Sequence, residues 1–436
     1  MKITLFWHRR DLRFTDNAGL AAALQAGAPV LPLFIYDADI LAPLPPDDAR
    51  LTFIHHHVER LAHEAHEAGG GLLARHGQVL AVFQQLLQDY DLQAVYTNED
   101  YEPAAIARDT AVAKLLYAHD VEFHAFKDQV IFAKDEVLTK NGKPPKVFGA
   151  YSKTWQAQAT DADFQAHPSA RLFTKEHLAR PHRADAARPS LKDLGFEPHE
   201  QYTPPAQPPP AAVVKHYHQT RDFPALEPGS TRMSVHLRFG TLSVRELMRQ
   251  ARRENSKLLN EMIWRDFFMM LLWHFPHTAT EAYDPRMRHL PWRDAPAEFQ
   301  AWCEGRTGQP FVDAGMRQLN ATGYLPNRAR IVAASYLCKH LFIDWQLGER
   351  YFAEKLLDYD LSNNVGNWQW VAGTGAIAAP WFRIFNPESQ QKQYDPTFAY
   401  IKKWVPEYGT PKYAKPLVDL QFGRDRALQL FREGRQ

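Results

Sequence analysis

KITLFWHRRDLRFTDN, residues 2–17, joins a short β-rich run to a charged loop, and similar runs recur through the first 130 residues. The later runs are VLPLFIYD (30–37), GLLARHG (71–77), LQAVYTNED (92–100) and VEFHAFKD (121–128), with helical patterns between them. This alternation predicts an α/β domain built on a doubly wound parallel sheet. Such sheets bind ligands at the C-terminal ends of their strands. The loop HRRDLRFTDN lacks the G-x-G-x-x-G pattern, which argues against a dehydrogenase-type dinucleotide site.

The rest of the chain divides into a weakly patterned stretch and a helical region. Between residues 131 and 212 the periodicity fades, and the stretch ends in TPPAQPPPAA, whose prolines cannot continue a helix. From residue 213 onward, apolar residues recur with a period of about 3.6. We therefore expect an α/β domain at 1–130, an interdomain linker at 131–212 and an all-α domain at 213–436.

The composition places the chain among ordinary globular proteins. Hydrophobic residues make up 45% and charged residues 23% of its 436 residues. The two cysteines, Cys303 and Cys338, lie in apolar helical patterns, so we expect neither a disulfide framework nor a metal site. No stretch approaches the roughly 18 apolar residues of a membrane span. We expect a cytoplasmic protein, monomeric and without a membrane partner.

Charge is distributed unevenly along the chain. Residues 1–130 hold 10 Lys and Arg against 18 Asp and Glu, a net charge of −8, whereas the remainder holds 41 against 32, a net charge of +9. A polyanion would therefore bind the C-terminal part. A solvated surface explains the same excess equally well, so charge alone leaves both readings open.

Five blocks of unusual composition lie in the helical region. They are YHQTRDFPALEPGSTRMS (217–234), NEMIWRDFF (260–268), GYLPNRARI (323–331), DYDLSNNVGNWQWVAGTG (358–375) and RIFNPESQ (383–390). In this order, together with WHRRDLR (7–13), they resemble the photolyase and cryptochrome family of blue-light flavoproteins. The resemblance covers essentially the whole chain and is strongest to the class I enzymes that split cyclobutane pyrimidine dimers.

The resemblance implies a bound FAD. The GSTRMS segment offers the hydroxyls of Ser230, Thr231 and Ser234 at a helix start, which suits a phosphate, although an ordinary N-cap has the same composition. Asn364 matches the family position facing flavin N5, where an amide can accept or donate as a proton moves. The residues that the resemblance assigns to FAD are Tyr217, Ser230, Thr231, Arg232, Met233, Ser234, Arg265, Arg330, Asp358, Tyr359, Asp360 and Asn364.

The tryptophans and a set of polar residues receive separate assignments. Trp368, Trp345 and Trp292 match the family's electron relay, although any single tryptophan is more often part of a core. Glu261 and Trp264 are three residues apart and share a helix face, which suits a flipped base. The resemblance assigns to damaged DNA the residues Arg221, Glu261, Trp264, Asn327, Arg328, Trp370 and Gln390, and to catalysis Glu261, Asn364 and the three relay tryptophans.

Some positions depart from the family pattern. Ile331 and Pro326 replace the methionine and histidine that are common there. Ala104 and Ala105 stand where folate-using relatives carry an Asn-Glu pair, so methenyltetrahydrofolate is disfavoured as a second, antenna chromophore. Arg238 replaces a lysine expected in deazaflavin-using relatives. The antenna remains open between a deazaflavin, a second flavin and none.

The resemblance implies light-dependent DNA repair. In this reaction FADH⁻, excited by light, donates an electron to a cyclobutane dimer flipped out of UV-damaged DNA, the ring opens, and the electron returns. A cryptochrome photoreceptor is one alternative, but the segment after Gln390 has no low-complexity tail. A (6-4) photolyase is another, but its chemistry requires a histidine pair and residues 323–337 contain no histidine.

Overall fold

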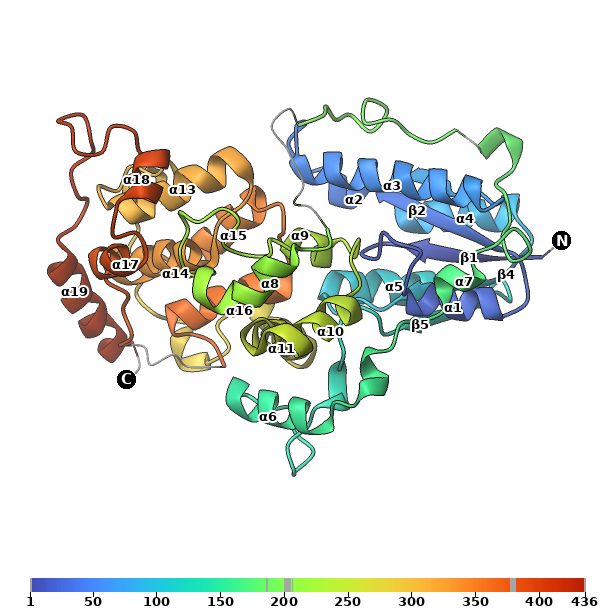
Figure 1. The fold of residues 1–436 in the computed structure, drawn as a ribbon, viewed down its shortest axis with the longest axis horizontal. Coiled ribbons are helices and arrows are strands. Elements are labelled where there is room, and N and C mark those ends of the chain that lie inside the picture. The colour runs from blue at the N-terminus through green and yellow to red at the C-terminus, as the bar shows by residue number, and fades with distance from the viewer. Residues whose placement is uncertain (1, 186, 200–204, 206, 377–381, 435–436) are drawn as a thin grey trace. The chain divides into compact units, whose positions relative to one another are not determined.

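The structure is a computed structural model that describes residues 2–185, 187–199, 205, 207–376 and 382–434 (Figure 1). The chain forms two compact units. Unit 1 comprises Met1–Ala133, Ala159–Pro208 and Met233–Gln250, and unit 2 comprises Lys134–Gln158, Pro209–Arg232 and Ala251–Gln436. No described helix is long and apolar enough to cross a membrane.

Unit 1 is built on a five-stranded parallel sheet with the strand order β3-β2-β1-β4-β5. The strands are β1 (Ile3–His8), β2 (Val30–Asp37), β3 (Leu73–Gly77), β4 (Leu92–Asn98) and β5 (Glu122–Phe126). Every residue of β1 and nearly every residue of β2 is buried, because helices cover both faces of the sheet. The doubly wound α/β prediction is therefore confirmed.

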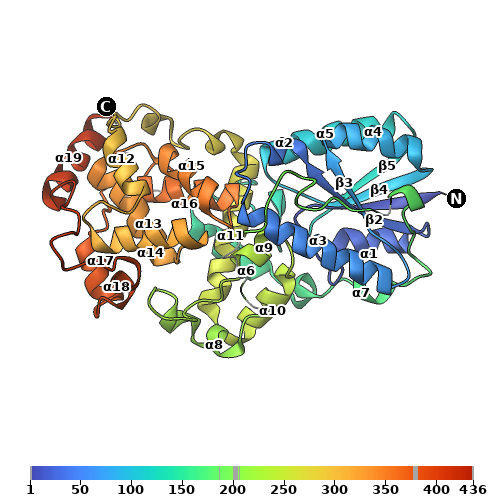
Figure 2. The ribbon, with the colours of Figure 1, turned by 90° about the horizontal axis from the view of Figure 1, so that it is seen from above.

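The helices of unit 1 lie in two layers. Figure 2 shows α4 and α5 on one side of the sheet and α1, α3 and α7 on the other. The bounds of these helices are α1 (Ala18–Gln25), α3 (Ala49–Glu67), α4 (Val79–Asp89), α5 (Pro103–Tyr117) and α7 (Ser169–Leu172). Unit 1 also contains α2 (Ala38–Leu41), α9 (Ser234–Arg238) and, up to Gln250, α10 (Val244–Glu254).

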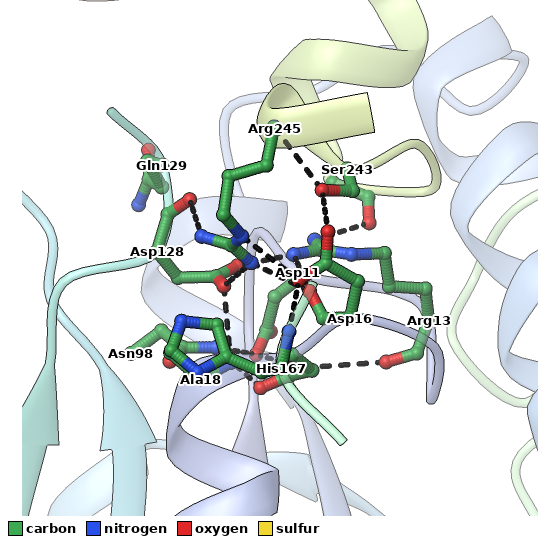
Figure 3. A network of polar contacts seen from close by, with 12 residues as sticks. Asp11, Arg13, Asp16, Ala18, Asn98, Asp128, Gln129, His167, Ser243 and Arg245 are labelled. Carbon is green, nitrogen blue, oxygen red and sulfur yellow. Dashed lines mark hydrogen bonds and ion pairs between the residues drawn. The ribbon is translucent and has the colours of Figure 1, made fainter. Parts of the chain in front are cut away.

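A buried ionic network occupies the strand ends of this sheet (Figure 3). Arg13, just beyond β1, lies 2.6 Å from Asp128, beyond β5, and Arg245 of α10 lies 2.7 Å from the same carboxylate. Arg245 also lies 2.8 Å from Asp16. Burial alone would raise the pKa of Asp128, but the two arginines hold it below its ordinary value. The polar groups at the edge where such sheets bind ligands therefore fix α10 in place.

The secondary-structure elements formed by the described residues of unit 2 are all helices, which confirms the all-α prediction for the C-terminal part. Its core centres on α13, α14, α15 and α16, which are grouped together in Figure 1. The helices are α6 (Phe148–Gln158), α8 (Ala211–Thr220), α11 (Ser256–His274), α12 (Pro296–Cys303), α13 (Pro310–Thr322), α14 (Asn327–Ser335), α15 (Trp345–Lys355), α16 (Leu361–Ala372), α17 (Pro387–Tyr394), α18 (Ala399–Trp404) and α19 (Leu420–Glu433), with a π-helical turn at Tyr336–Leu341.

The two units do not follow the contiguous boundaries expected from the sequence. The segment 131–212, expected to be a linker, is divided between them. Its helix α6 packs on α11, where the Trp155 Nε1 donates to Asp266 at 3.2 Å. The later part of the segment pairs with the sheet, because Leu178 forms a parallel bridge with Val30. Long-range contacts of this kind leave no periodic signal in the segment itself.

Candidate functional site

The two aspartates that precede α16 have different partners. Asp358 forms an ion pair with Arg330 of α14, whose Nη2 lies 2.8 and 3.0 Å from its two carboxylate oxygens. Asp360 is the N-cap of α16 and accepts hydrogen bonds from the backbone and side chain of Asn363. Tyr359 lies between them, half-buried. The aspartates therefore fix the start of α16 and its position against α14.

The side chain of Asn364 is oriented by Glu349 of α15. Its Nδ2 donates to the Glu349 carboxylate at 2.9 Å and to the Glu349 carbonyl at 3.2 Å. Both side-chain hydrogen bonds of Asn364 to described residues use Nδ2, so Oδ1 remains available as an acceptor. Burial raises the pKa of Glu349, although its hydrogen bonds from Asn364 and Tyr359 act in the opposite direction. An amide held in this way fits a flavin whose N5 carries a proton.

The GSTRMS segment crosses the division between the units. Ser230, Thr231 and Arg232 belong to unit 2, whereas Met233 and Ser234 belong to unit 1. Within unit 2, the Ser230 hydroxyl lies 3.0 Å from the Tyr324 hydroxyl. The expected helix start is present at Ser234, but α9 has only five residues, so its dipole can contribute little to holding a phosphate. Within unit 2, the hydroxyls of Ser230 and Thr231 have the chemistry to donate to a phosphate.

Two further residues expected to bind FAD lie on the long helices of unit 2. Tyr217 of α8 is buried, and burial raises the pKa of its hydroxyl well above the ordinary value. Arg265 lies half-buried on α11, next to Trp264. Together with hydroxyl groups, the amide oxygen of Asn364 and the ion-paired guanidinium of Arg330 provide hydrogen-bond donors and acceptors. Such a set fits a polar, phosphate-bearing cofactor such as FAD.

Glu261, the carboxyl expected at the base edge, is held by two cations. Arg221 donates from Nη1 to Glu261 Oε1 in a short ion pair, and Lys257 Nζ lies 3.2 Å from the same oxygen. Arg221 is buried, whereas the Glu261 side chain is 28% exposed. Arg221, assigned to a phosphate, and Glu261, assigned to the lesion, come from separate blocks of the sequence but form one ion pair.

Arg328 connects two other blocks. Its Nη1 donates to Gln390 of α17 at 3.1 Å, and its Nη2 donates to Asp222 at 3.0 Å. Its guanidinium also lies over the ring of Tyr394, 4.1 Å from the ring centre. Asn327 is exposed at the first position of α14. Arg328 and Gln390, both assigned to the DNA strand, are therefore in contact. No sequence motif indicated that Asp222 or Tyr394 would contact Arg328.

The two tryptophans expected to line a lesion pocket have aromatic neighbours. Trp264 stacks on Phe148 of α6, with ring centres 3.6 Å apart and planes 5° apart. Trp370 lies against Phe385, and the Arg383 guanidinium lies 5.5 Å from its ring centre. Phe268 contacts Trp264 and lines a small pocket together with Trp370. Phe148 comes from the segment expected to be a linker and was not foreseen.

The three relay tryptophans belong to one core. Trp345 and Trp368 are buried within it, and Trp292 packs at its edge, half-buried. Gly348, one turn after Trp345 on α15, packs against the indole of Trp368. A Cβ atom at this position would lie 2.3 Å from the indole. Trp302 is a further buried indole, and its ring centre lies 6.1 Å from that of Trp368. The sequence interpretation assigned no role to Trp302.

Two features of unit 1 bear on the antenna chromophore, namely a cluster of ion pairs that includes Arg238 and the small side chains at the start of α5. Arg238 lies 2.8 Å from Glu102, and Arg10 lies 2.8 Å from the same carboxylate and 3.2 Å from Asp100. The arginine that replaces the expected lysine therefore forms an ion pair within unit 1. Ala104 and Ala105 begin α5 and supply neither an amide nor a carboxylate for a folate.

Two family models match the chain. The model described as "DNA photolyase" matches residues 4–170, and the model described as "FAD binding domain of DNA photolyase" matches residues 258–412. The second match confirms the prediction of FAD as cofactor. The identity and presence of an antenna chromophore remain predictions.

Relatives similar over nearly the whole chain carry one name. "Deoxyribodipyrimidine photo-lyase" of Halobacterium salinarum is 35% identical over 99% of this chain and 99% of its own. The protein of that name from Synechococcus sp. is 36% identical over 92% of this chain and 87% of its own.

Solved structures show the same fold. A class III photolyase from Agrobacterium tumefaciens superimposes with a TM-score of 0.87 at 30% identity, covering 100% of this chain and 98% of its own. An archaeal photolyase from Sulfolobus tokodaii, whose structure holds two FAD molecules, superimposes with a TM-score of 0.86 at 31% identity, covering 99% of each chain. The chain therefore belongs to the photolyase and cryptochrome family of flavoproteins.

Proposed function

We propose that this protein is a light-driven DNA repair enzyme that splits cyclobutane pyrimidine dimers in UV-damaged DNA. The observation that carries the proposal is the pairing of Glu261 with Arg221 beside Trp264. A carboxyl group and a flat apolar wall on α11, with a phosphate-binding cation from the end of α8, are the groups that a flipped pyrimidine requires. The names of the full-length relatives support the same activity.

In this proposal the chain's own residues divide the work. Trp264 and Trp370 provide apolar walls for the flipped dimer, and Glu261 and Asn327 hydrogen-bond its polar edges. Arg221, Arg328 and Gln390 hold the flanking phosphates. When bound, FAD supplies the electron that opens the dimer and receives it back. Asn364, held by Glu349, offers its amide oxygen to the flavin, and the three relay tryptophans carry electrons that restore the reduced cofactor.

The proposal includes the setting of the reaction. The protein acts as a monomer in the cytoplasm, and its partner is UV-damaged DNA. A deazaflavin or a second flavin is preferred to methenyltetrahydrofolate as antenna, because Ala104 and Ala105 offer a pterin no polar side chain.

The test compares two lesions in one duplex sequence. Reduced protein is mixed with duplexes that carry either one cyclobutane dimer or one (6-4) photoproduct, and restored pyrimidines are counted after blue illumination and in the dark. We expect repair of the cyclobutane dimer in the light only. Repair of the (6-4) duplex instead would reassign the lesion, and repair of neither would favour a photoreceptor.

A further inference from the structure

Asp222 lies between the two arginines that the proposed function assigns to DNA phosphates. It follows Arg221, the C-cap of α8, in the turn that leaves this helix. One of its carboxylate oxygens lies 3.0 Å from Arg328 Nη2 and 4.0 Å from Arg221 Nε. The sequence interpretation gave this residue no role.

Both arginines keep unused hydrogen-bonding capacity at this position. The Nε atoms of Arg221 and Arg328 are buried, and neither has a hydrogen-bond partner among the described residues. The Arg328 side chain is 15% exposed, and that of Asp222 is 29% exposed. The site thus holds two guanidinium groups with one partly exposed carboxylate between them. The Nε atom of each guanidinium makes no hydrogen bond to a described residue.

A carboxylate in this place resembles a phosphate in both charge and geometry. Each presents oxygen atoms that accept from a guanidinium fork, and each carries negative charge. A DNA phosphate that approaches Arg328 must therefore share its donors with Asp222 and is repelled by the charge of that carboxylate. Binding of a DNA phosphate to Arg328 is therefore less favourable than its binding to an arginine that has no carboxylate partner.

We propose that Asp222 is an internal substitute for a DNA phosphate, which occupies Arg328 in the free protein and weakens the strand contact when DNA binds. The inference rests on the proposed function, since it takes the polyanion to be DNA. Phosphate contacts carry no information about the lesion, so Asp222 lowers affinity for damaged and undamaged DNA by the same factor. Its effect is to limit the time that the protein spends on undamaged DNA.

The test is Asp222→Asn, which removes the charge and keeps an oxygen that can accept from Arg328. Binding is measured by fluorescence anisotropy on duplexes with and without one cyclobutane dimer over a series of salt concentrations. We expect affinity for both duplexes to rise by roughly twofold to fivefold at low salt, the range of one partly exposed ion pair. The logarithm of affinity should also fall more steeply with the logarithm of salt concentration.

A matched control separates this effect from net charge. Glu227 lies in the same loop, is exposed, and forms an ion pair with Lys403 at 3.0 Å. Glu227→Gln makes the same change in net charge away from the two arginines, so we expect a smaller gain in affinity than for Asp222→Asn. Equal gains in the two variants would overturn the proposal.

A second variant locates the effect on Arg328. In an Arg328→Ala background, adding Asp222→Asn should leave affinity nearly unchanged, because the competition it relieves is already gone. An undiminished gain in that background, or a loss of affinity in Asp222→Asn alone, would overturn the proposal. FAD content and melting temperature verify that each variant is folded.

The result for the parent protein bears on the proposed function separately. A parent that binds both duplexes equally well would contradict repair of this lesion, while the gain of Asp222→Asn on undamaged DNA would still decide the role of Asp222. A parent that prefers the damaged duplex, with Asp222→Asn unchanged, would contradict only the role of Asp222.

Discussion

Key side chains of the candidate site are held by partners that come from other parts of the sequence. Asn364 contacts Glu349, Glu261 contacts Arg221, and Arg328 contacts Asp222, at separations of 15, 40 and 106 residues. Motif resemblance assigned Asn364, Arg328 and both members of the pair Glu261 and Arg221. It could not assign Glu349 or Asp222, because a charged residue on a helix or in a turn resembles ordinary surface until its partner is known.

Burial of Glu349 predicts a pH-dependent effect of Glu349→Gln on stability. Burial raises the pKa of this carboxyl in the folded state, so its contribution to stability is full below the unfolded pKa and is lost as pH rises through the folded pKa. Glutamine does not ionise and still accepts from Asn364. The free energy of unfolding of the variant should therefore increase relative to that of the parent as pH rises from below the ordinary pKa of a glutamate through the raised pKa of Glu349.

Denaturant unfolding of both proteins across this range measures the difference. Glu354→Gln, an exposed position on the same helix, serves as the control for loss of one carboxylate. A difference between Glu349→Gln and parent that falls with pH would contradict the assignment of Glu349 as a buried carboxyl.

Glu261→Ala tests the carboxyl expected at the dimer's edge. Its loss leaves the polar edge of the dimer without a partner, at a cost of about 1 to 3 kcal/mol, and should lower the repair yield per absorbed photon at saturating DNA. FAD content should not change. The alanine also leaves Arg221 without its carboxylate, so Glu261→Gln, which keeps an acceptor for Arg221, should retain more activity. Equal yields for Glu261→Ala and parent would remove Glu261 from the repair step.

The packing of α15 on α16 places two of the indoles proposed for the relay, Trp345 and Trp368, in one core. Gly348 on α15 gives Trp368 of α16 its space, since a Cβ there would come 2.3 Å from the indole and 2.6 Å from Leu337. Five strands of the sheet were predicted from their runs of apolar residues, because such runs carry the signal locally. The position of α6 on α11 was not predicted, because its contacts Phe148 with Trp264 and Trp155 with Asp266 join distant segments.

Gly348→Ala should destabilise unit 2 by overpacking the contact between α15 and α16. We expect a loss of about 1 to 3 kcal/mol in the free energy of unfolding. Gly149→Ala, on α6, is the matched control, since a Cβ there meets nothing within 4 Å. It should be neutral or slightly stabilising, by up to about 1 kcal/mol. A neutral Gly348→Ala would show that the indole of Trp368 is not held against α15.

Trp292→Phe tests the relay. Trp292 is the half-buried member of the three, so its loss should slow the photoreduction of oxidised FAD by an external reductant. Repair by protein reduced beforehand should be nearly unchanged, because the relay restores the cofactor and is not the path to the dimer. Trp404→Phe, a half-buried indole at the edge of the same core, should leave both rates unchanged. Unaltered photoreduction in Trp292→Phe would remove Trp292 from the relay.

For the whole molecule, the sequence predicted both fold classes but not the way the chain is shared between the two units. Residues Met233–Gln250 join the α/β unit because Arg245 pairs with Asp16 and Asp128, more than a hundred residues away. A single sequence carries no periodic pattern that reports such a pairing. The motif blocks indicated the family correctly, because each block is local and the order of the blocks along the chain is specific.

An action spectrum of repair by the purified protein decides between a light-driven repair enzyme and a photoreceptor. Fully reduced protein and duplex DNA with one cyclobutane dimer are illuminated at a series of wavelengths, and repaired dimers are counted per incident photon. We expect repair that follows the absorption of the reduced flavin, with an added band if an antenna chromophore is bound. Failure of fully reduced protein to repair the dimer at any wavelength would contradict the account and place this chain among the photoreceptors of its family.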